Sequence, residues 1–175
     1  MVPPQPDNPY ARAKLESEIA GAEQAQRHGT AFTALRLCAP YGPGQIARTV
    51  VSVFVEAALQ GAPLQYYGRG TREQCFTFVA DVARAFALAL EAPPGTYNVA
   101  GESPVTMKKL GYLVAEVCGV PNKLVRPSGH PDPQEGVRAR FDCGLAKRSL
   151  GWVPAVSLRD GLARHVAEHR NRVSP

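Results

Sequence analysis

The chain has 175 residues, with 20 Lys and Arg against 15 Asp and Glu, which gives a net charge of +5 at pH 7. A chain of this length can bury one proper core, and its apolar and charged fractions are those of an ordinary globular protein. No apolar run approaches the roughly 20 residues of a membrane span, and no basic run is interleaved with aromatic residues, which excludes a membrane-spanning protein and disfavours nucleic-acid binding. The positive charge comes mainly from arginine, which suits phosphate contacts; the alternative is an ordinary solvated surface.

Helices and strands are expected to alternate along the chain, which predicts an α/β protein. The expected helices have apolar residues at helical spacing and capping residues at their ends, and they span 8–28, 49–60, 79–91 and 106–118, with a last one after the capping box Ser157–Asp160. The expected strands span 30–38, 64–67, 74–78, 96–99 and 123–126. The stretch 127–140 is rich in Pro and Gly and is expected to be a loop.

Tyr10 and Lys14 stand four residues apart at the start of the first expected helix, so both side chains leave one face. A phenol ordinarily titrates near pH 10 and is a poor base at neutral pH. A lysine one turn away and the positive end of the helix dipole both favour the phenolate, so the pair can serve as an acid/base centre. The alternative is an ordinary amphipathic helix whose buried stripe is Ala11, Leu15, Ile19 and Ala22.

The cysteines and histidines suggest a reducing compartment and no metal. The four cysteines form no Cys-x-x-Cys pair and are expected to be reduced and mostly buried: Cys38, Cys75, Cys118 and Cys143. The N-terminal run MVPPQPDNP contains no signal-peptide core, so a cytoplasmic protein is expected. His165 and His169 lie four apart, a spacing that can hold zinc, but no acidic or sulfur ligand sits beside them, so no metal site is expected.

Four further runs follow the tyrosine helix at characteristic spacing: TAFTALRLCAPYGPGQ (30–45), APLQYYGRGTREQCFTFVADVARA (62–85), GTYNVAGESPVTMKKL (95–110) and DCGLAKRSLGWVPAVSLRDGL (142–162). Together with Tyr-x-x-x-Lys they resemble the C-terminal half of an extended short-chain dehydrogenase/reductase of the NAD-dependent epimerase/dehydratase family. The resemblance covers about residues 7–168. It implies that 1–61 is a remnant of a Rossmann-like doubly wound sheet. Residues 62–175 would then form mainly a small substrate-binding α/β subdomain, with returning segments of the sheet.

The resemblance also implies a nucleotide-sugar substrate and NAD or NADP as the cofactor. Tyr10 would take a proton from a sugar hydroxyl while hydride passes to the nicotinamide. Lys14 would bind the nicotinamide ribose, and Pro40 would also contact the cofactor. Epimerases, dehydratases and reductases share this first oxidation, so the sequence does not choose among them.

The resemblance places three residues at positions that contact the substrate. Two of them differ from the residue usual in the family, and the role of the third has two interpretations. Ala39 stands where the family often has an asparagine that reaches the substrate diphosphate. Gln74 stands where the commonest pattern has a phosphate-binding arginine, and the resemblance implies that Arg72 takes over that role; the alternative is a surface arginine. Asp81 matches the family's acidic residue before a long helix and is expected to be a helix cap.

No strand, glycine-rich turn and helix that would carry a dinucleotide's pyrophosphate occurs in the sequence. The expectation is therefore that the cofactor-binding half is absent from this chain and that the chain alone binds NAD weakly or not at all. It would be part of an epimerase, dehydratase or reductase and not active by itself. The alternative is a non-catalytic nucleotide-sugar-binding or oligomerisation module. In either case a homodimer or larger assembly, or an N-terminal half supplied in trans, is expected.

Overall fold

The computed structural model describes residues 5–173, with side chains to residue 171. Residues 1–4 and 174–175, the outer ends of the two expected regions, lie outside it. The helices are α1 (Pro9–His28), α2 (Val50–Leu59), α3 (Val79–Ala89), α4 (Met107–Cys118) and α5 (Leu158–Val173), with a 3-10 turn η1 (Asn122–Leu124) and a π-helical turn η2 (Ala146–Leu150). The strands are β1 (Thr33–Leu37), β2 (Pro40–Tyr41), β3 (Leu64–Tyr66), β4 (Glu73–Gln74), β5 (Thr77–Phe78), β6 (Gly95–Val99), β7 (Val105–Thr106) and β8 (Val125–Pro127). The expected α/β class is confirmed.

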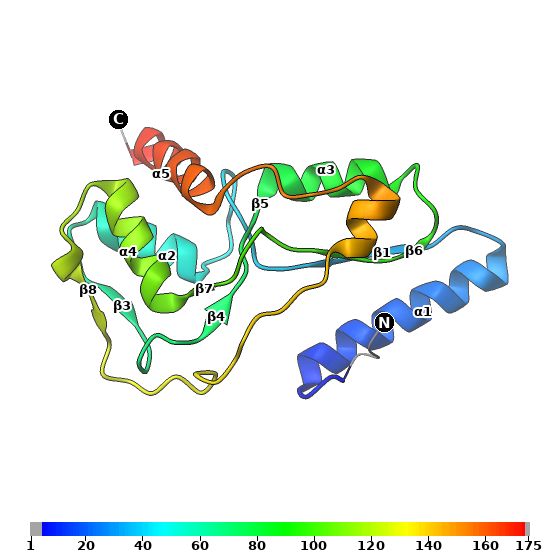
Figure 1. Cartoon of the computed structure of the whole chain (residues 1–175), viewed down its shortest axis with the longest axis horizontal. Helices are drawn as coiled ribbons and strands as arrows, with labels where there is room; N and C mark the ends of the chain where they lie inside the picture. Colours follow the sequence, from blue (N-terminus) through cyan, green and yellow to red (C-terminus); the bar gives the residue numbers. More distant parts are fainter. Residues whose placement is uncertain (1–4, 174–175) are drawn as a thin grey trace.

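One part of the molecule is built on β1 and β6, which pair in parallel from Thr33 opposite Gly95 to Leu37 opposite Val99. Figure 1 shows this strand pair between α3 and η2 on one side and α1 on the other. A small core fills the α3 side: Ala85, Tyr97, Val99, Ala146, Leu150 and Trp152. On the other side α1 buries none of its residues fully.

The other part is built on β3 and β8, which are also parallel; α2 and α4 pack against this pair, and α5 packs against α4 (Figure 1). Its core is larger and includes residues with no exposed surface, among them Val55, Leu64, Leu110, Val114 and Leu162. Two short strand pairs join the parts: β2 with β5 in parallel, and β4 with β7 antiparallel.

Local capping fixes the helix ends where the sequence predicts them. The Asn8 side chain accepts a hydrogen bond from the Ala11 N–H at 2.9 Å, and α1 ends at Gly29 in the left-handed conformation, φ 63°. Thr106 caps α4 in the same way, accepting from the Lys109 N–H at 3.2 Å. Ser157 Oγ accepts from the Asp160 N–H at 3.1 Å and donates to the Asp160 carboxylate, as expected for the last helix.

Two expectations about local structure are wrong, and one element has no counterpart among the expected ones. The expected strand 74–78 is two separate strands, because Gln74 pairs with Val105 on β7 whereas Thr77 pairs with Pro40 on β2. The stripe proposed for α1 is not buried: Ala11 and Leu15 are half-buried, and Ile19 and Ala22 are exposed. The π-helical turn η2 was not foreseen at all.

The sequence predicts both the state of the cysteines and the length of the helices. Cys38, Cys75, Cys118 and Cys143 are free thiols, and the first three are buried, as expected. Within residues 5–173, no helix combines the length and apolar character needed to cross a membrane.

Candidate functional site

A hollow of about 340 Å³ opens between the segment after β1, the start of α2 and the chain around β4. Its walls are formed by Ala39, Pro40, Tyr41, Thr49, Val50, Val51, Arg72, Gln74 and Phe76. Four of the residues singled out from the sequence therefore come together here: Ala39, Pro40, Arg72 and Gln74. They come from segments more than thirty positions apart.

The wall formed by the segment after β1 is fixed by the pairing of β2 with β5, and it contains a residue with a strained backbone, Ala39. Thr77 Oγ1 donates to the Cys38 carbonyl at 2.7 Å and the Thr77 N–H donates to the Ala39 carbonyl at 3.3 Å. Ala39 has φ 36°, the one positive φ of a non-glycine residue among the described residues. Such a backbone costs free energy for alanine, and strain of this kind is often found at functional sites.

Tyr41 is a structural part of the same wall. Its hydroxyl donates to the Leu158 carbonyl at 3.2 Å, and its ring packs edge-on against Phe76 and Phe78. Burial raises the pKa of the Tyr41 phenol above its ordinary value, with a smaller contribution from Asp81. Tyr41 therefore stays protonated at neutral pH and does not offer a base.

The start of α2 borders the hollow. The first N–H groups of a helix have no intrahelical acceptor, and the helix dipole makes this end attractive to anions. Thr49 is the N-cap residue; its own N–H donates to Ser52 Oγ at 2.9 Å, and its Oγ1 accepts from Gln45 at 3.0 Å. Val50 and Val51, the first residues of the helix, line the hollow.

Arg72 is the charged residue among those that line the hollow, and it is not a free surface arginine. Its side chain is 24% exposed and forms an ion pair with Asp132, Nε to Oδ2 3.3 Å. Its Nη1 also donates to Gln134 Oε1 at 2.6 Å. Gln74 lies two residues along an extended chain and so on the same side of it. A cation, an amide and a helix start around one hollow can bind an anionic group such as a phosphate.

Tyr10 and Lys14 lie elsewhere. Both occupy the first turns of α1, as expected, and Lys14 Nζ stands 5.6 Å from the centre of the Tyr10 ring, a cation–π distance. Tyr10 is 73% exposed. Neither residue lines the hollow, so within the described chain the pair and the hollow are separate features.

Asp81 is not the helix cap that the sequence predicts. The N-cap of α3 is Phe78, and Asp81 lies inside the first turn, 2% exposed. Its carboxylate accepts from the N–H groups of Ala155 and Val156 at 3.0–3.1 Å, and Trp152 Nε1 donates to its carbonyl at 2.9 Å. Asp81 therefore fastens the chain before α5 to α3, a structural role.

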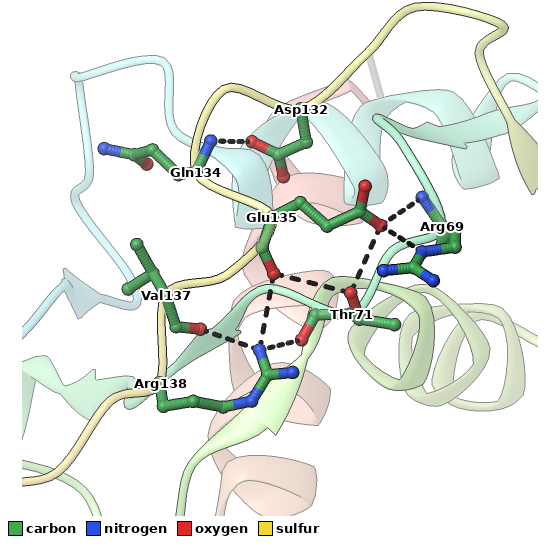
Figure 2. A network of polar contacts seen from close by, with 7 residues as sticks. All are labelled: Arg69, Thr71, Asp132, Gln134, Glu135, Val137 and Arg138. Carbon is green, nitrogen blue, oxygen red and sulfur yellow. Dashed lines mark hydrogen bonds and ion pairs between the residues drawn. The ribbon is translucent and has the colours of Figure 1, made fainter.

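The loop expected at 127–140 starts after β8 and is held in place along its length; residues 128–140 are called the strap below. Figure 2 shows Glu135 accepting from the Arg69 N–H at 2.7 Å and from Thr71 Oγ1 at 3.2 Å. Arg138 Nη1 donates to the carbonyls of Thr71 and Val137. Sequence reasoning missed the strap's Asp132 and Gln134, because polar residues in a Pro- and Gly-rich stretch usually face solvent.

Cys38 and the pair His165 and His169 are further titratable groups among the described residues. Burial raises the pKa of the Cys38 thiol to about 12, with a further increase from Cys75, so no nucleophilic thiolate forms there at neutral pH. His165 is buried, with its ring 4.7 Å from that of His169. Across residues 5–173, no three His, Cys, Asp or Glu side chains are grouped so that they could hold a metal ion.

Comparison with known proteins places the chain. The model of the NAD dependent epimerase/dehydratase family matches residues 1–100. A dTDP-glucose 4,6-dehydratase of Actinoplanes sp. is 30% identical over 172 residues, which are 96% of this chain and 53% of that protein. UDP-glucuronic acid decarboxylase 2 of Arabidopsis thaliana is 36% identical over 169 residues, 94% of this chain and 37% of that protein.

Solved structures agree. The UDP-glucose 4-epimerase of Thermotoga maritima with UDP-glucose superposes with a TM-score of 0.90 at 31% identity, over 98% of this chain and 56% of that one. The UDP-glucose 4-epimerase of Thermus thermophilus in complex with NAD gives a TM-score of 0.86 at 30% identity, over 98% and 57%. The chain thus spans about half the length of these relatives and has the α/β fold of this part of them. It belongs to the NAD-dependent epimerase/dehydratase family.

Proposed function

We propose that this chain is the substrate-binding part of a nucleotide-sugar epimerase, dehydratase or reductase that acts by transient NAD(P)-dependent hydride transfer. The observation that carries the proposal is the convergence of Ala39, Pro40, Arg72 and Gln74 on one hollow at the start of α2. Residues 1–61 would belong to a Rossmann-like part and 62–175 mainly to a substrate-binding part. The free thiols suit a cytoplasmic protein.

The hollow suits a nucleoside diphosphate. Arg72 uses Nε and Nη1 towards the strap and keeps further N–H groups for phosphate oxygens. Gln74 and the first N–H groups of α2 add neutral donors. The apolar side chains of Val50, Val51 and Phe76 offer contact surface beside them.

Tyr10 would be the acid/base residue in the complete enzyme, with Lys14 favouring its phenolate. In the described residues Tyr10 is 73% exposed and Pro40 is exposed as well, so neither is enclosed as a cofactor contact would be. We therefore propose that the chain alone binds NAD weakly or not at all. Polypeptide beyond the given sequence, in cis or in trans, would enclose Tyr10 and supply the cofactor site.

A second candidate is a non-catalytic nucleotide-sugar-binding or oligomerisation module. It is favoured by the separation of the exposed Tyr10 from the hollow, since binding at the hollow needs no contribution from α1. Two exposed apolar residues, Phe86 on α3 at 54% and Leu90 directly after α3 at 87%, also favour association. In both candidates we propose a dimer or larger assembly, or an N-terminal half in trans; a monomer by light scattering at high concentration would contradict self-association.

Calorimetric titration of the 175-residue chain tests the proposal. UDP or dTDP is expected to bind, and NAD is expected to bind far more weakly. Arg72→Gln should weaken nucleotide binding about 10-fold or more, because a charged hydrogen-bond donor to phosphate is lost. Arg27→Gln, the same change at an exposed position near the end of α1, is the matched control and should have no effect. Micromolar NAD binding, or equal effects of the two substitutions, would contradict the proposal.

A further inference from the structure

We propose that Asp132 and Gln134 are positioning residues that aim Arg72 at the phosphates of a bound nucleoside diphosphate. This inference rests on the proposed function and assigns to the strap a part in ligand binding. Its basis is that Arg72, which lines the hollow, is held by two strap side chains: Asp132 forms an ion pair with Nε at 3.3 Å, and Gln134 Oε1 accepts a hydrogen bond from Nη1 at 2.6 Å.

Asp132 and Gln134 together form a clamp on Arg72, and the two residues are also hydrogen-bonded to each other. The Asp132 side chain is 5% exposed, and its Oδ2 faces Arg72 Nε. Its other oxygen, Oδ1, accepts from the Gln134 N–H at 2.9 Å (Figure 2). One carboxylate thus orients both the arginine and the residue that gives the arginine its second contact.

The strap is fixed on both sides of this clamp. Before it, the His130 carbonyl accepts from the Gly68 N–H at 2.8 Å. After it, Glu135 holds Arg69 and Thr71, and the Val137 carbonyl accepts from the Glu73 N–H at 3.1 Å. These anchors lie in residues 68–73, the segment that carries Arg72 itself. The strap and this wall of the hollow therefore form one unit, with the arginine between them.

Fixing the arginine before the ligand arrives should strengthen binding. An arginine side chain has many rotamers, and a ligand that must immobilise it loses affinity in doing so. The strap contacts Nε through the ion pair with Asp132 and accepts one hydrogen bond from Nη1, so the guanidinium has further N–H groups that can donate to a ligand in the hollow. The opposite idea is that Asp132 neutralises Arg72 and weakens anion binding. The two ideas predict opposite changes in nucleotide affinity when the Asp132 carboxylate is replaced: positioning predicts weaker binding, and neutralisation predicts tighter binding.

The test is calorimetric titration of the whole chain with UDP and with dTDP. Asp132→Asn keeps the shape and one oxygen but removes the charge, and it should weaken binding about 5-fold or more. Gln134→Ala changes no charge and should weaken binding about 3-fold or more. Arg140→Gln removes a strap ion pair to Glu73 at 3.2 Å that does not involve Arg72, and it should change affinity by less than about 2-fold.

A double-mutant cycle with Arg72→Gln separates positioning from a general effect on the fold. In the Arg72→Gln background, Asp132→Asn should cause no further loss, because the residue it positions is gone. Equal loss in both backgrounds, or unchanged or tighter binding by Asp132→Asn alone, overturns the positioning role. If Arg72→Gln itself leaves binding unchanged, or the wild-type chain binds neither nucleotide, the proposed function fails and the inference with it.

Discussion

The part around β3 and β8 and the part around β1 and β6 both consist of a parallel strand pair flanked by helices, yet they differ in how completely they are packed. In the first, Leu64, Leu110 and Val114 have no exposed surface. In the second, α1 buries no residue fully, and Phe86 on α3 and Leu90 directly after α3 are more than half exposed. Parallel strands are normally covered on both faces and paired with more than one neighbour. In the described residues both pairs have only two strands, and the part around β3 and β8 is the more completely packed of the two.

The candidate functional residues are also divided between the two parts. The hollow is bounded largely by α2 and the chain around β4, which the strap braces. Tyr10 and Lys14 lie on α1, the least buried helix. Under the proposed function, ligand binding would depend mainly on the well-packed part, and chemistry at Tyr10 would require α1 to be covered.

The largest expected effect sharpens the contrast in packing. Leu110→Ala should lower the free energy of unfolding by about 2–5 kcal/mol, because it empties a fully buried site. Phe86→Ala, at a side chain that is 54% exposed, should change it by no more than about 0.5 kcal/mol. Denaturant unfolding of both variants provides the comparison. Equal losses would mean that the outer face of α3 is covered in solution, and the two parts would then not differ in how completely they are packed.

The next effect concerns chemistry on α1. Under the proposed function, in a protein that also contains a cofactor-binding half, Tyr10→Phe should reduce turnover of a nucleotide sugar about 10²-fold or more, equivalent to about 2.7 kcal/mol. Unfolding should be unchanged, because only an exposed hydroxyl is removed. Tyr67→Phe, at a tyrosine that is 54% exposed on the other part, is the control. Undiminished turnover in Tyr10→Phe would remove the tyrosine from the mechanism.

A smaller effect is expected at the junction of the two parts, where Ala39 has φ 36°. Ala39→Gly should raise the free energy of unfolding by about 0.5–1 kcal/mol, because glycine adopts a positive φ without the steric penalty of a Cβ. Ala13→Gly on the exposed side of α1, where φ is helical, should instead be neutral or destabilising by up to about 1 kcal/mol. Thermal unfolding would measure both, and a loss of stability in Ala39→Gly would contradict the strain.

The smallest effect is the pH response of the strap. The Arg69 N–H, and then the Arg69 guanidinium, lower the pKa of Glu135 below its ordinary value of 4.5. A carboxylate with a lowered pKa stabilises the docked strap above its unfolded-state pKa, and this contribution is lost as the pH falls through the lowered value. Backbone amide signals of Arg69 and Thr71 should therefore titrate with a midpoint below 4.5. In Glu135→Gln that titration should vanish; its persistence would assign it to another group.

Sequence alone determined the features that depend on neighbouring residues. Asn8, Thr106 and Ser157 cap helices through hydrogen bonds to residues three positions away, and Gly29 ends α1 because it adopts a left-handed conformation. The periodicity and the family motifs likewise gave the α/β class, which the relatives confirm. Such signals are local, so they can be read before the chain is folded.

Tertiary structure decided what depends on distant partners. The run 74–78 splits because its two ends pair with different strands, and Asp81 fastens residues more than seventy positions away instead of capping its own helix. Arg72 likewise forms an ion pair with Asp132, which lies sixty positions further along the chain. These pairings arise from side chains that meet only after the strands are in register, and no local pattern in the sequence encodes which of several polar residues will meet.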